Sequence, residues 1–515
     1  MKSKPMKHLL GLFVLLACVS TLAAEKPNII VIMADDLGYG DLSCYGAKAV
    51  QTPAIDRLAR EGVRFTSGYC SASTCTPTRF SLLTGTYAFR QKGTGIAPPN
   101  GPAIIKPGTE TLPSILKRAG YATAVIGKWH LGLGDPAPDW NGELKPGPLD
   151  IGFDHAFLLP TTNDRVPQTF VEDRRVKNLE PADPLWVGEK KPSEDHATGL
   201  THRHTLKMDW SHGHNQTIHN GISRIGFYTG GTKARFRDEN LADAWVKESN
   251  RWIGANKERP FFLFFASQDI HVPRIAHERF QGKTTLGPRG DCIVQLDWCV
   301  GELMKTLDRI GLAEKTLVVF CSDNGPVLDD GYKDDAVEKL GDHQPAGPFR
   351  GGKYSVWEGG TRTPFITRWK GRIAPAVSDE IVSTVDFAAS FGALTRQTPV
   401  ADGCLDSLNI LDALLGKPGA RGRDHLLQQD NGSGNFGLRA RDWKLVRLEK
   451  RGTPQAVVSK DEPPLPAAKH TLYQLTDDPG EHRDVSAAHP EVLQRLTLQL
   501  DKLIQDGRSR PAMQP

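Results

Sequence analysis

The hydrophobic positions of the chain alternate between short continuous apolar runs and longer helical repeats. The continuous runs, typical of strands buried on both faces, are Asn28 to Ala34, Tyr121 to Ile126, Phe261 to Ala266 and Thr316 to Cys321. The segments with apolar residues at helical spacing are Thr52 to Gly62, Thr111 to Ala119, Asn240 to Ile253 and Asp291 to Ile310. This alternation predicts an α/β fold with a doubly wound, mostly parallel sheet flanked by helices.

Two stretches depart from that pattern. From about residue 140 to 230 the chain is rich in Pro, Gly and Asp with weak periodicity, which predicts a long irregular insertion. Beyond Ala401, Gly437 to Leu448 and Thr471 to Leu475 resemble short antiparallel strands, and His489 to Ile504 has the spacing of a closing helix. We therefore expect a catalytic α/β domain over residues 25–400 and a smaller C-terminal α+β subdomain over residues 401–515.

The N-terminus has the pattern of a secretory signal peptide over residues 1–24. Three lysines precede the apolar run Leu9 to Ala17, which is too short to span a membrane, and small residues follow it. The prediction is a secreted or periplasmic protein. The alternative uses the segment ending in Cys18, which resembles a bacterial lipoprotein box and would place a lipid anchor, and thus membrane association, at that cysteine.

Composition argues against two classes of protein, those that bind nucleic acid and small disulfide-stabilised scaffolds. The 515 residues suffice for more than one domain, and a formal charge of +4 without a long basic run argues against a nucleic-acid partner. Of eight cysteines, seven remain after the predicted signal. In a helix Cys292 and Cys299 would lie ~10 Å apart, beyond the reach of a disulfide, so the chain is not a disulfide scaffold.

Polar residues follow each predicted strand directly. These clusters are Asp35-Asp36, Lys128-Trp129-His130, Gln268-Asp269-Ile270-His271 and Asp323-Asn324. In open α/β sheets ligands bind beyond the carboxyl ends of the strands, so the clusters should meet at one edge. Asp35-Asp36 alone favours the start of a turn, but together with Asp323 and Asn324 it predicts an oxygen-rich site for Ca²⁺, with Mg²⁺ as the alternative.

A further candidate lies in residues 71–85, SASTCTPTRFSLLTG. Thr76 suits an N-cap and Pro77 the first helical position, which would place Cys75 just ahead of a helix N-terminus. Such a terminus favours an anion, and Arg79 follows one turn later. The alternative is a capped helix with a buried structural cysteine.

The spacing Cys-x-Pro-x-Arg resembles the maturation signature of the type I sulfatases of the alkaline-phosphatase superfamily, in which the cysteine is oxidised to formylglycine. Cys70 lacks Pro and Arg at the matching offsets. Other segments match motifs of that family in order: NIIVIMADDLGYGDL, GKWHLG, DIHVP, SDNG and GGKYSVWEGG. The resemblance extends from Asn28 to the C-terminal helix.

The resemblance implies a role for each matching residue. The implied metal ligands are Asp35, Asp36, residue 75, Asp323 and Asn324. The implied catalytic residues are Cys75 as formylglycine, Arg79, Lys128, His130, His271 and Lys353. His271 would protonate the leaving group, and His130 would act as the base that restores the aldehyde. A formylglycine-generating maturation enzyme is the implied protein partner.

The substrate is predicted less directly. Residues that would line a polar sugar subsite are Asn163, Asp164, Arg165, Trp210, His212, His214, His219, His343 and Arg350, although each is also compatible with a hydrogen-bonded loop. We expect an exported enzyme that hydrolyses sulfate esters of a glycan. The alternatives are an arylsulfatase, a phosphatase or phosphonate hydrolase of the same superfamily, and a glycan-binding protein with unconverted Cys75.

Overall fold

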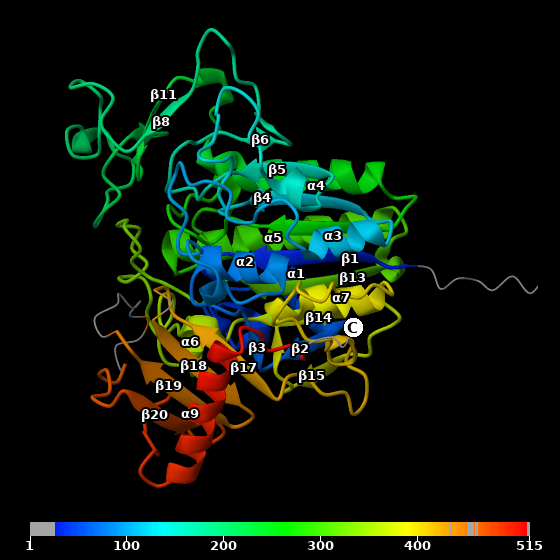
Figure 1. Ribbon diagram of the computed structural model, residues 1–515. Coiled ribbons are helices and arrows are strands. Elements are labelled where there is room, and N and C mark those ends of the chain that lie inside the picture. The colour runs from blue at the N-terminus through cyan, green and yellow to red at the C-terminus, as the bar shows by residue number, and fades with distance from the viewer. Residues whose placement is uncertain (1–25, 433, 451–457, 459–461, 512–515) are drawn as a thin grey trace, which may run out of the picture.

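The computed structural model describes residues 26–432, 434–450, 458 and 462–511, so the predicted signal peptide and Cys18 lie outside the described residues. A sheet with the strand order β15-β2-β14-β13-β1-β12-β4-β5-β6-β7 runs through the centre (Figure 1). Its parallel core consists of β1 (Asn28–Ala34), β12 (Phe261–Ala266), β13 (Thr316–Ser322), β4 (Ala122–Lys128) and β5 (His155–Leu159).

Helices cover both faces of this sheet. Ile29 and Val31 of β1 pack with the apolar residues of α2 (Cys75–Thr84), α3 (Leu112–Arg118) and α7 (Phe387–Leu394). Ile30 and Ile32 point the other way, because side chains alternate along a strand. They contribute to a second core with α1 (Pro53–Arg60), α4 (Leu241–Ala255) and α5 (Gly287–Arg309). The predicted doubly wound, mostly parallel sheet is confirmed.

Both sheet edges differ from the sequence prediction. The segment 140–230 is not irregular throughout: β5 lies inside it and pairs in parallel with β4, followed by β6 (Val171–Glu172) and β7 (Arg175–Val176). The β5 run is short and surrounded by turn residues, which hides it from periodicity. At the opposite edge, β14 (Phe365–Arg368) and β2 (Val63–Phe65) run antiparallel, and β15 (Ala376–Ser378) closes the sheet.

The rest of the insertion forms two-stranded ribbons, of which one pairs β8 (Trp186–Gly188) with β11 (Phe227–Thr229). The other pairs β9 (Ile218–His219) with β10 (Ile222–Ser223). In Figure 1 the β8–β11 ribbon projects from the end of the molecule at which β1 finishes.

The C-terminal part is an antiparallel sheet packed against a helix, as predicted. Its strands are β17 (His425–Gln429), β18 (Asn435–Ala440), β19 (Trp443–Leu448) and β20 (His470–Gln474). Leu496 and Leu500 of α9 (Pro490–Gln505) are fully buried against it. The domain boundary near residue 401 stays a prediction.

The cysteines bear on one further prediction from the sequence. All seven cysteines in the described part of the chain are free, so the expectation for Cys292 and Cys299 is confirmed. Within the same residues, no helix combines the length and the apolar character that a membrane span needs.

Candidate active site

Ten residues that the sequence singles out converge beyond the carboxyl ends of the parallel strands. We call them the catalytic cluster: Asp35, Asp36, Cys75, Arg79, Lys128, His130, His271, Asp323, Asn324 and Lys353. All are buried. Asp35 and Asp36 follow β1, Asp323 and Asn324 follow β13, and Lys128 ends β4. The main-chain register of β1 with β13, which pairs Ala34 with Ser322, therefore brings the two acidic motifs together.

Each carboxylate of the cluster has a cationic partner. Lys128 donates from Nζ to Asp35. Lys353 Nζ lies 3.0 Å from Asp36, and Arg79 donates from Nε and Nη2 to Asp323 Oδ2 over 3.0 and 2.8 Å. Within each pair the cation and the carboxylate neutralise each other. None of the six side chains is exposed to solvent, and a buried charge without a partner would be strongly destabilising.

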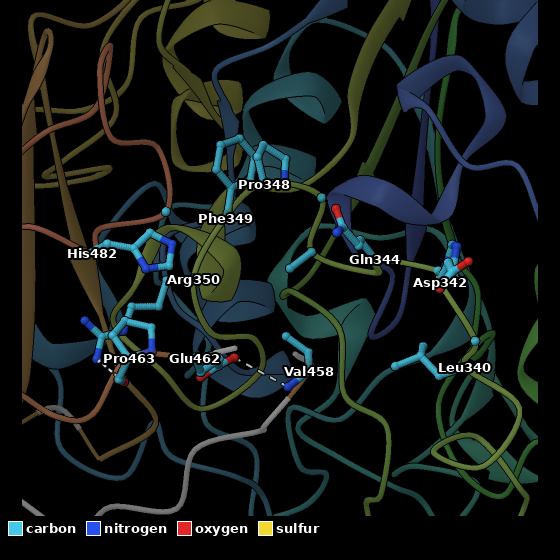
Figure 2. A pocket seen from close by; sticks show the side chains of 15 residues that line it. Leu340, Asp342, Gln344, Pro348, Phe349, Arg350, Val458, Glu462, Pro463 and His482 are labelled. Atoms are coloured by element: carbon cyan, nitrogen blue, oxygen red, sulfur yellow. Dashed lines mark hydrogen bonds between the residues drawn. The ribbon is translucent and has the colours of Figure 1, made fainter. Parts of the chain in front are cut away.

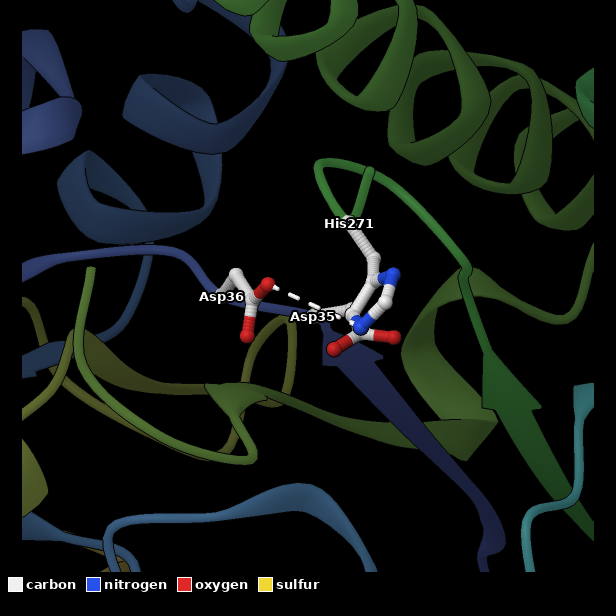
Figure 3. Close-up of side chains that lie close together, drawn as sticks. All are labelled: Asp35, Asp36 and His271. Carbon is white, nitrogen blue, oxygen red and sulfur yellow. Dashed lines mark ion pairs between the residues drawn. The ribbon is translucent and has the colours of Figure 1, made fainter. Parts of the chain in front are cut away.

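The donor set fits a divalent metal ion. Asp35 Oδ1 and Asn324 Oδ1 are buried oxygens for which the described residues supply no hydrogen-bond donor, although such acceptors are normally satisfied. Figure 3 shows Asp35 and Asp36 beside His271, and one ligand atom from each lies within 4.8 Å of the others. Carboxylate and amide oxygens suit Ca²⁺ or Mg²⁺, and a cation there would satisfy both oxygens.

The protonation preferences of the two neighbouring aspartates differ. Burial, together with the charge of Asp323, raises the pKa of Asp35 well above its usual range. Burial acts in the same direction on Asp36, but Lys353 and Lys128 outweigh it and lower its pKa. The positive charges near Asp35 are therefore too few to keep its carboxylate ionised. A metal ion bound there would supply the additional positive charge.

Cys75 lies at the first turn of α2. The helix begins at Cys75 itself with Thr74 as N-cap, so the predicted cap at Thr76 is wrong. Thr76 instead donates from Oγ1 to the carbonyl of His130 over 3.0 Å, and Pro77 fits the third helical position because that position needs no amide donor. Burial raises the pKa of the Cys75 thiol despite Lys128 and Lys353. Unmodified Cys75 is therefore a poor nucleophile.

His130 faces residue 75. Its Nδ1 lies 3.2 Å from Cys75 Sγ, while Nε2 lies 3.1 Å from the carbonyl of Ala97. A carbonyl only accepts hydrogen bonds, so the neutral ring carries its proton on Nε2 and presents an acceptor to residue 75. Burial and Lys128 lower the pKa of His130 well below its usual range. The ring is therefore held as a neutral base.

His271 faces the acidic side of the cluster. Its Nδ1 donates to the carbonyl of Val272 over 2.7 Å, which leaves Nε2 3.9 Å from Asp36 Oδ2. Burial, Lys128 and Lys353 lower its pKa. An anionic substrate would offset the two lysines, so the ring gains a proton more readily in the substrate complex.

Asp330 is a member of this site that the sequence analysis missed. Its carboxylate accepts from Lys353 Nζ over 2.7 Å and from the Tyr354 hydroxyl over 2.9 Å. Lys353 is thus held between Asp36 and Asp330, which raise its pKa although burial opposes them. The acidic pair Asp329-Asp330 shortly after Asp323-Asn324 was the only available signal, and it resembles an ordinary solvated turn.

Three predicted subsite residues, Asp164, Arg165 and His214, contact one another. Arg165 Nη1 and His214 Nε2 both contact Asp164 Oδ2 over 2.9 Å. The positive charge of Arg165 contributes to lowering the pKa of His130, and the ionised Cys75 thiolate in turn would favour the charged guanidinium. Arg165 is 17% exposed at its side chain and so remains reachable from solvent. The trio offers a cation, a carboxylate and an imidazole for sugar hydroxyls.

The other subsite candidates are engaged elsewhere. Asn163 Nδ2 donates to the carbonyls of His271 and Pro273, and His219 contacts Tyr228 and the Phe236 carbonyl. His212 is exposed, and Trp210 donates to the Gly199 carbonyl.

His343 and Arg350 line a separate cavity of about 430 Å³, shown in Figure 2. His343 Nε2 contacts Asp41 over 2.8 Å. Arg350 donates to the Glu481, Pro463 and Pro464 carbonyls and stacks over Trp357. The contacts of Arg350 tie it to the C-terminal part of the chain, and His343 is tied to Asp41, so both side chains are engaged away from Cys75.

Comparison with known proteins places this geometry in a family. Residues 27–397 match the family model described as Sulfatase. The chain is 47% identical to an N-acetylgalactosamine-6-O-sulfatase of Bacteroides thetaiotaomicron over 482 residues, which cover 93% of each chain. It is 32% identical to human arylsulfatase A over 530 residues, covering 97% of this chain and 93% of that protein.

Solved structures agree. A structure from work on the metabolism of multiple glycosaminoglycans by Bacteroides thetaiotaomicron superposes with a TM-score of 0.88 at 46% identity, covering 93% of this chain and 99% of the other. A phosphonate monoester hydrolase of Agrobacterium radiobacter superposes with a TM-score of 0.57 at 17% identity, covering 93% and 96%. The second likeness concerns the fold alone.

Proposed function

The chain belongs to the sulfatase family, and on that premise we propose that it is an exported carbohydrate sulfatase that removes a 6-O-sulfate from an N-acetylgalactosamine-type sugar. Its sulfatase relatives establish that it is a sulfuric ester hydrolase. The proposal adds the sugar, the position of the ester and the conversion of Cys75 to formylglycine. The signal-like N-terminus supports export.

The proposed site combines two groups that the chain itself does not supply in its unmodified form. Formylglycine at position 75 would provide, as its hydrate, a hydroxyl that attacks sulfur, and a divalent ion would lower the pKa of that hydroxyl. Asp35, Asp36, Asp323 and Asn324 would hold the ion. Ca²⁺ is the preferred ion and Mg²⁺ the alternative.

The remaining residues of the catalytic cluster act on charge and protons. Lys128, Lys353 and Arg79, each paired with a carboxylate of the catalytic cluster, are the cations that would stabilise the negative charge on the sulfuryl oxygens. His271 Nε2 would donate a proton to the departing sugar oxygen, and His130 Nδ1 would take a proton from residue 75 when the aldehyde is restored. The second role agrees with the 3.2 Å contact between His130 and Cys75.

One observation carries the choice of substrate: the 47% identity to an N-acetylgalactosamine-6-O-sulfatase over 93% of the chain. The polar trio of Asp164, Arg165 and His214 supports a sugar over a simple aryl group, because hydroxyls need buried polar partners. Human arylsulfatase A, at 32%, is the more distant relative.

The experiment is a panel of 6-O-, 4-O- and 3-O-sulfated N-acetylgalactosamine, 6-O-sulfated N-acetylglucosamine and an aryl sulfate, with sulfate release as the readout. The proposal predicts the highest kcat/KM for 6-O-sulfated N-acetylgalactosamine. Arg165→Ala should raise KM for the sugar about ten- to a hundredfold and change that for the aryl sulfate little. A preference for the aryl sulfate or another isomer would contradict the proposal.

A further inference from the structure

His271 lies on a loop that has no regular structure of its own. Residues 267–277 connect β12 to the segment before α5 and contain neither helix nor strand. In a helix or strand, the backbone hydrogen bonds would fix the position of a side chain to within a few tenths of an ångström. Here, the position of the imidazole depends on the side chains that hold the loop from outside.

Gln295 of α5 ties the two ends of this loop together. The side chain is fully buried. Its Nε2 donates to Asp269 Oδ2 over 3.0 Å, and its Oε1 accepts from the backbone amide of His277 over 2.8 Å. One amide group therefore spans the loop on both sides of His271, and it does so from a long helix that packs on the central sheet.

The Asp269 end of this tie continues into the catalytic cluster. The amide of Asp35 donates to the Asp269 carbonyl over 2.9 Å, and the amide of Ile270 donates to the Asp35 carbonyl over 2.7 Å. The backbone immediately before His271 is thus docked on the end of β1. A shift of the Asp269 side chain would move His271 relative to Asp36, which is 3.9 Å away.

Other side chains also bond to this loop: Trp245 donates to Gln268, Gln281 donates to the Ala276 carbonyl, and two further side chains, Arg274 within the loop and Asn163 outside it, make two contacts or more. Arg274 donates to the Ile270 carbonyl and to Asp334, and Asn163 donates to the His271 and Pro273 carbonyls from the loop that carries Arg165. The hydrogen bonds of Gln295 go to this loop alone. Among these side chains, Gln295 is the one that bonds to the loop both before and after His271, so its loss would release both flanks of His271 at once.

We propose that Gln295 is a positioning residue for the leaving-group acid: it sets the place of His271 Nε2 without touching substrate, metal or residue 75. The proposal rests on the role of His271 in the proposed function. It predicts a consequence that depends on the leaving group. A sugar alkoxide needs its proton in the transition state, whereas an activated aryl oxide departs without one.

The test is Gln295→Met, which keeps the length of the side chain and removes both hydrogen bonds, assayed on a 6-O-sulfated sugar and on an activated aryl sulfate. Turnover of the sugar sulfate should fall about ten- to a hundredfold, mainly in kcat, and that of the aryl sulfate less than about threefold. Gln295→Leu provides a second variant, because it removes both hydrogen bonds with a different apolar side chain. The same split is expected.

Two control variants distinguish the positioning role of Gln295 from the acid role of His271 on which it rests. Gln428→Met removes another fully buried amide, which donates to Glu358 and Thr361 away from the loop, and should show no split between the substrates. His271→Ala should show a larger split than Gln295→Met. Equal losses on both substrates for Gln295→Met, beside a split for His271→Ala, would overturn the role of Gln295. No split for His271→Ala would overturn the acid role and the inference together.

Discussion

The Nδ1 atom of His130 lies 3.2 Å from the Sγ atom of Cys75, and the opposite ring nitrogen is held by the Ala97 carbonyl. His130 has a backbone φ of 52°, a conformation that side-chain-bearing residues adopt rarely and at a cost. The backbone therefore turns this imidazole toward residue 75 rather than along the strand direction of β4. The contact holds His130 beside the residue that the proposed function makes the nucleophile.

His130→Ala should slow the sugar sulfate and the activated aryl sulfate by similar factors, about 10²–10⁴. The reason is that the base acts on residue 75 after the alcohol has left, a step that both substrates share. Steady-state kcat on both substrates measures this. His219→Ala, which removes a buried histidine bonded to Tyr228, is the control for loss of stability. A loss confined to the sugar sulfate would show that His130 acts on the leaving group.

Removal of the metal should abolish activity and lower the melting temperature together. Without a cation, Asp35, Asp36 and Asp323 are brought together with two unsatisfied oxygens. Chelation followed by addition of Ca²⁺ or Mg²⁺ should restore both properties, and Asp35→Ala should respond to neither ion. Calorimetry and sulfate release on one preparation provide the readouts. Full activity after verified metal removal would exclude a metal at these residues.

His155 should make stability depend on pH. Burial alone would lower the pKa of His155, but Asp173 and Glu248, each 2.8 Å from a ring nitrogen, raise it to about 9. Because the folded-state pKa lies above the unfolded value of about 6.5, this contribution is complete below that value and is lost as pH rises through about 9. Over this range the free energy of unfolding should fall by about 1–3 kcal/mol, and the melting temperature should fall with it.

The matched variant is His155→Gln, which keeps a polar side chain between β5 and α4 and cannot become charged. Thermal unfolding at several pH values between 6 and about 9.5 compares the two proteins, and the difference cancels other titrating groups. A variant with the same slope against pH as the parent would show that His155 does not carry this charge.

The sequence predicts the sheet core and most of the site for a physical reason. Buried parallel strands are continuous apolar runs, so the polar residues at their ends, such as Asp35-Asp36 and Asp323-Asn324, are visible one segment at a time. Cys75, Arg79 and Lys353 lie outside these strand ends, and their roles follow from the resemblance of their motifs to those of sulfatases. The predictions that were wrong concern features that depend on contacts between distant parts of the chain. The run of β5 is too short to separate from turns, and Thr76 uses its hydroxyl on the His130 carbonyl instead of capping α2.

The substrate residues show the same limit. Nothing local distinguishes Arg165, which pairs with Asp164, from Arg350, which donates to backbone carbonyls of the C-terminal subdomain. Asp330 was missed because its partner, Lys353, is more than twenty positions away in the chain. Pairings of this kind are set by how loops pack, which composition and spacing do not encode.

The most direct test of the account is mass spectrometry of the tryptic peptide of residues 65–79 from catalytically active protein made with a maturation enzyme. The peptide holds Cys75 and, as an internal control, the buried Cys70. The account predicts an aldehyde at position 75, a thiol at position 70, and sulfate release in proportion to the converted fraction. An active preparation in which Cys75 is entirely an unmodified thiol would contradict it.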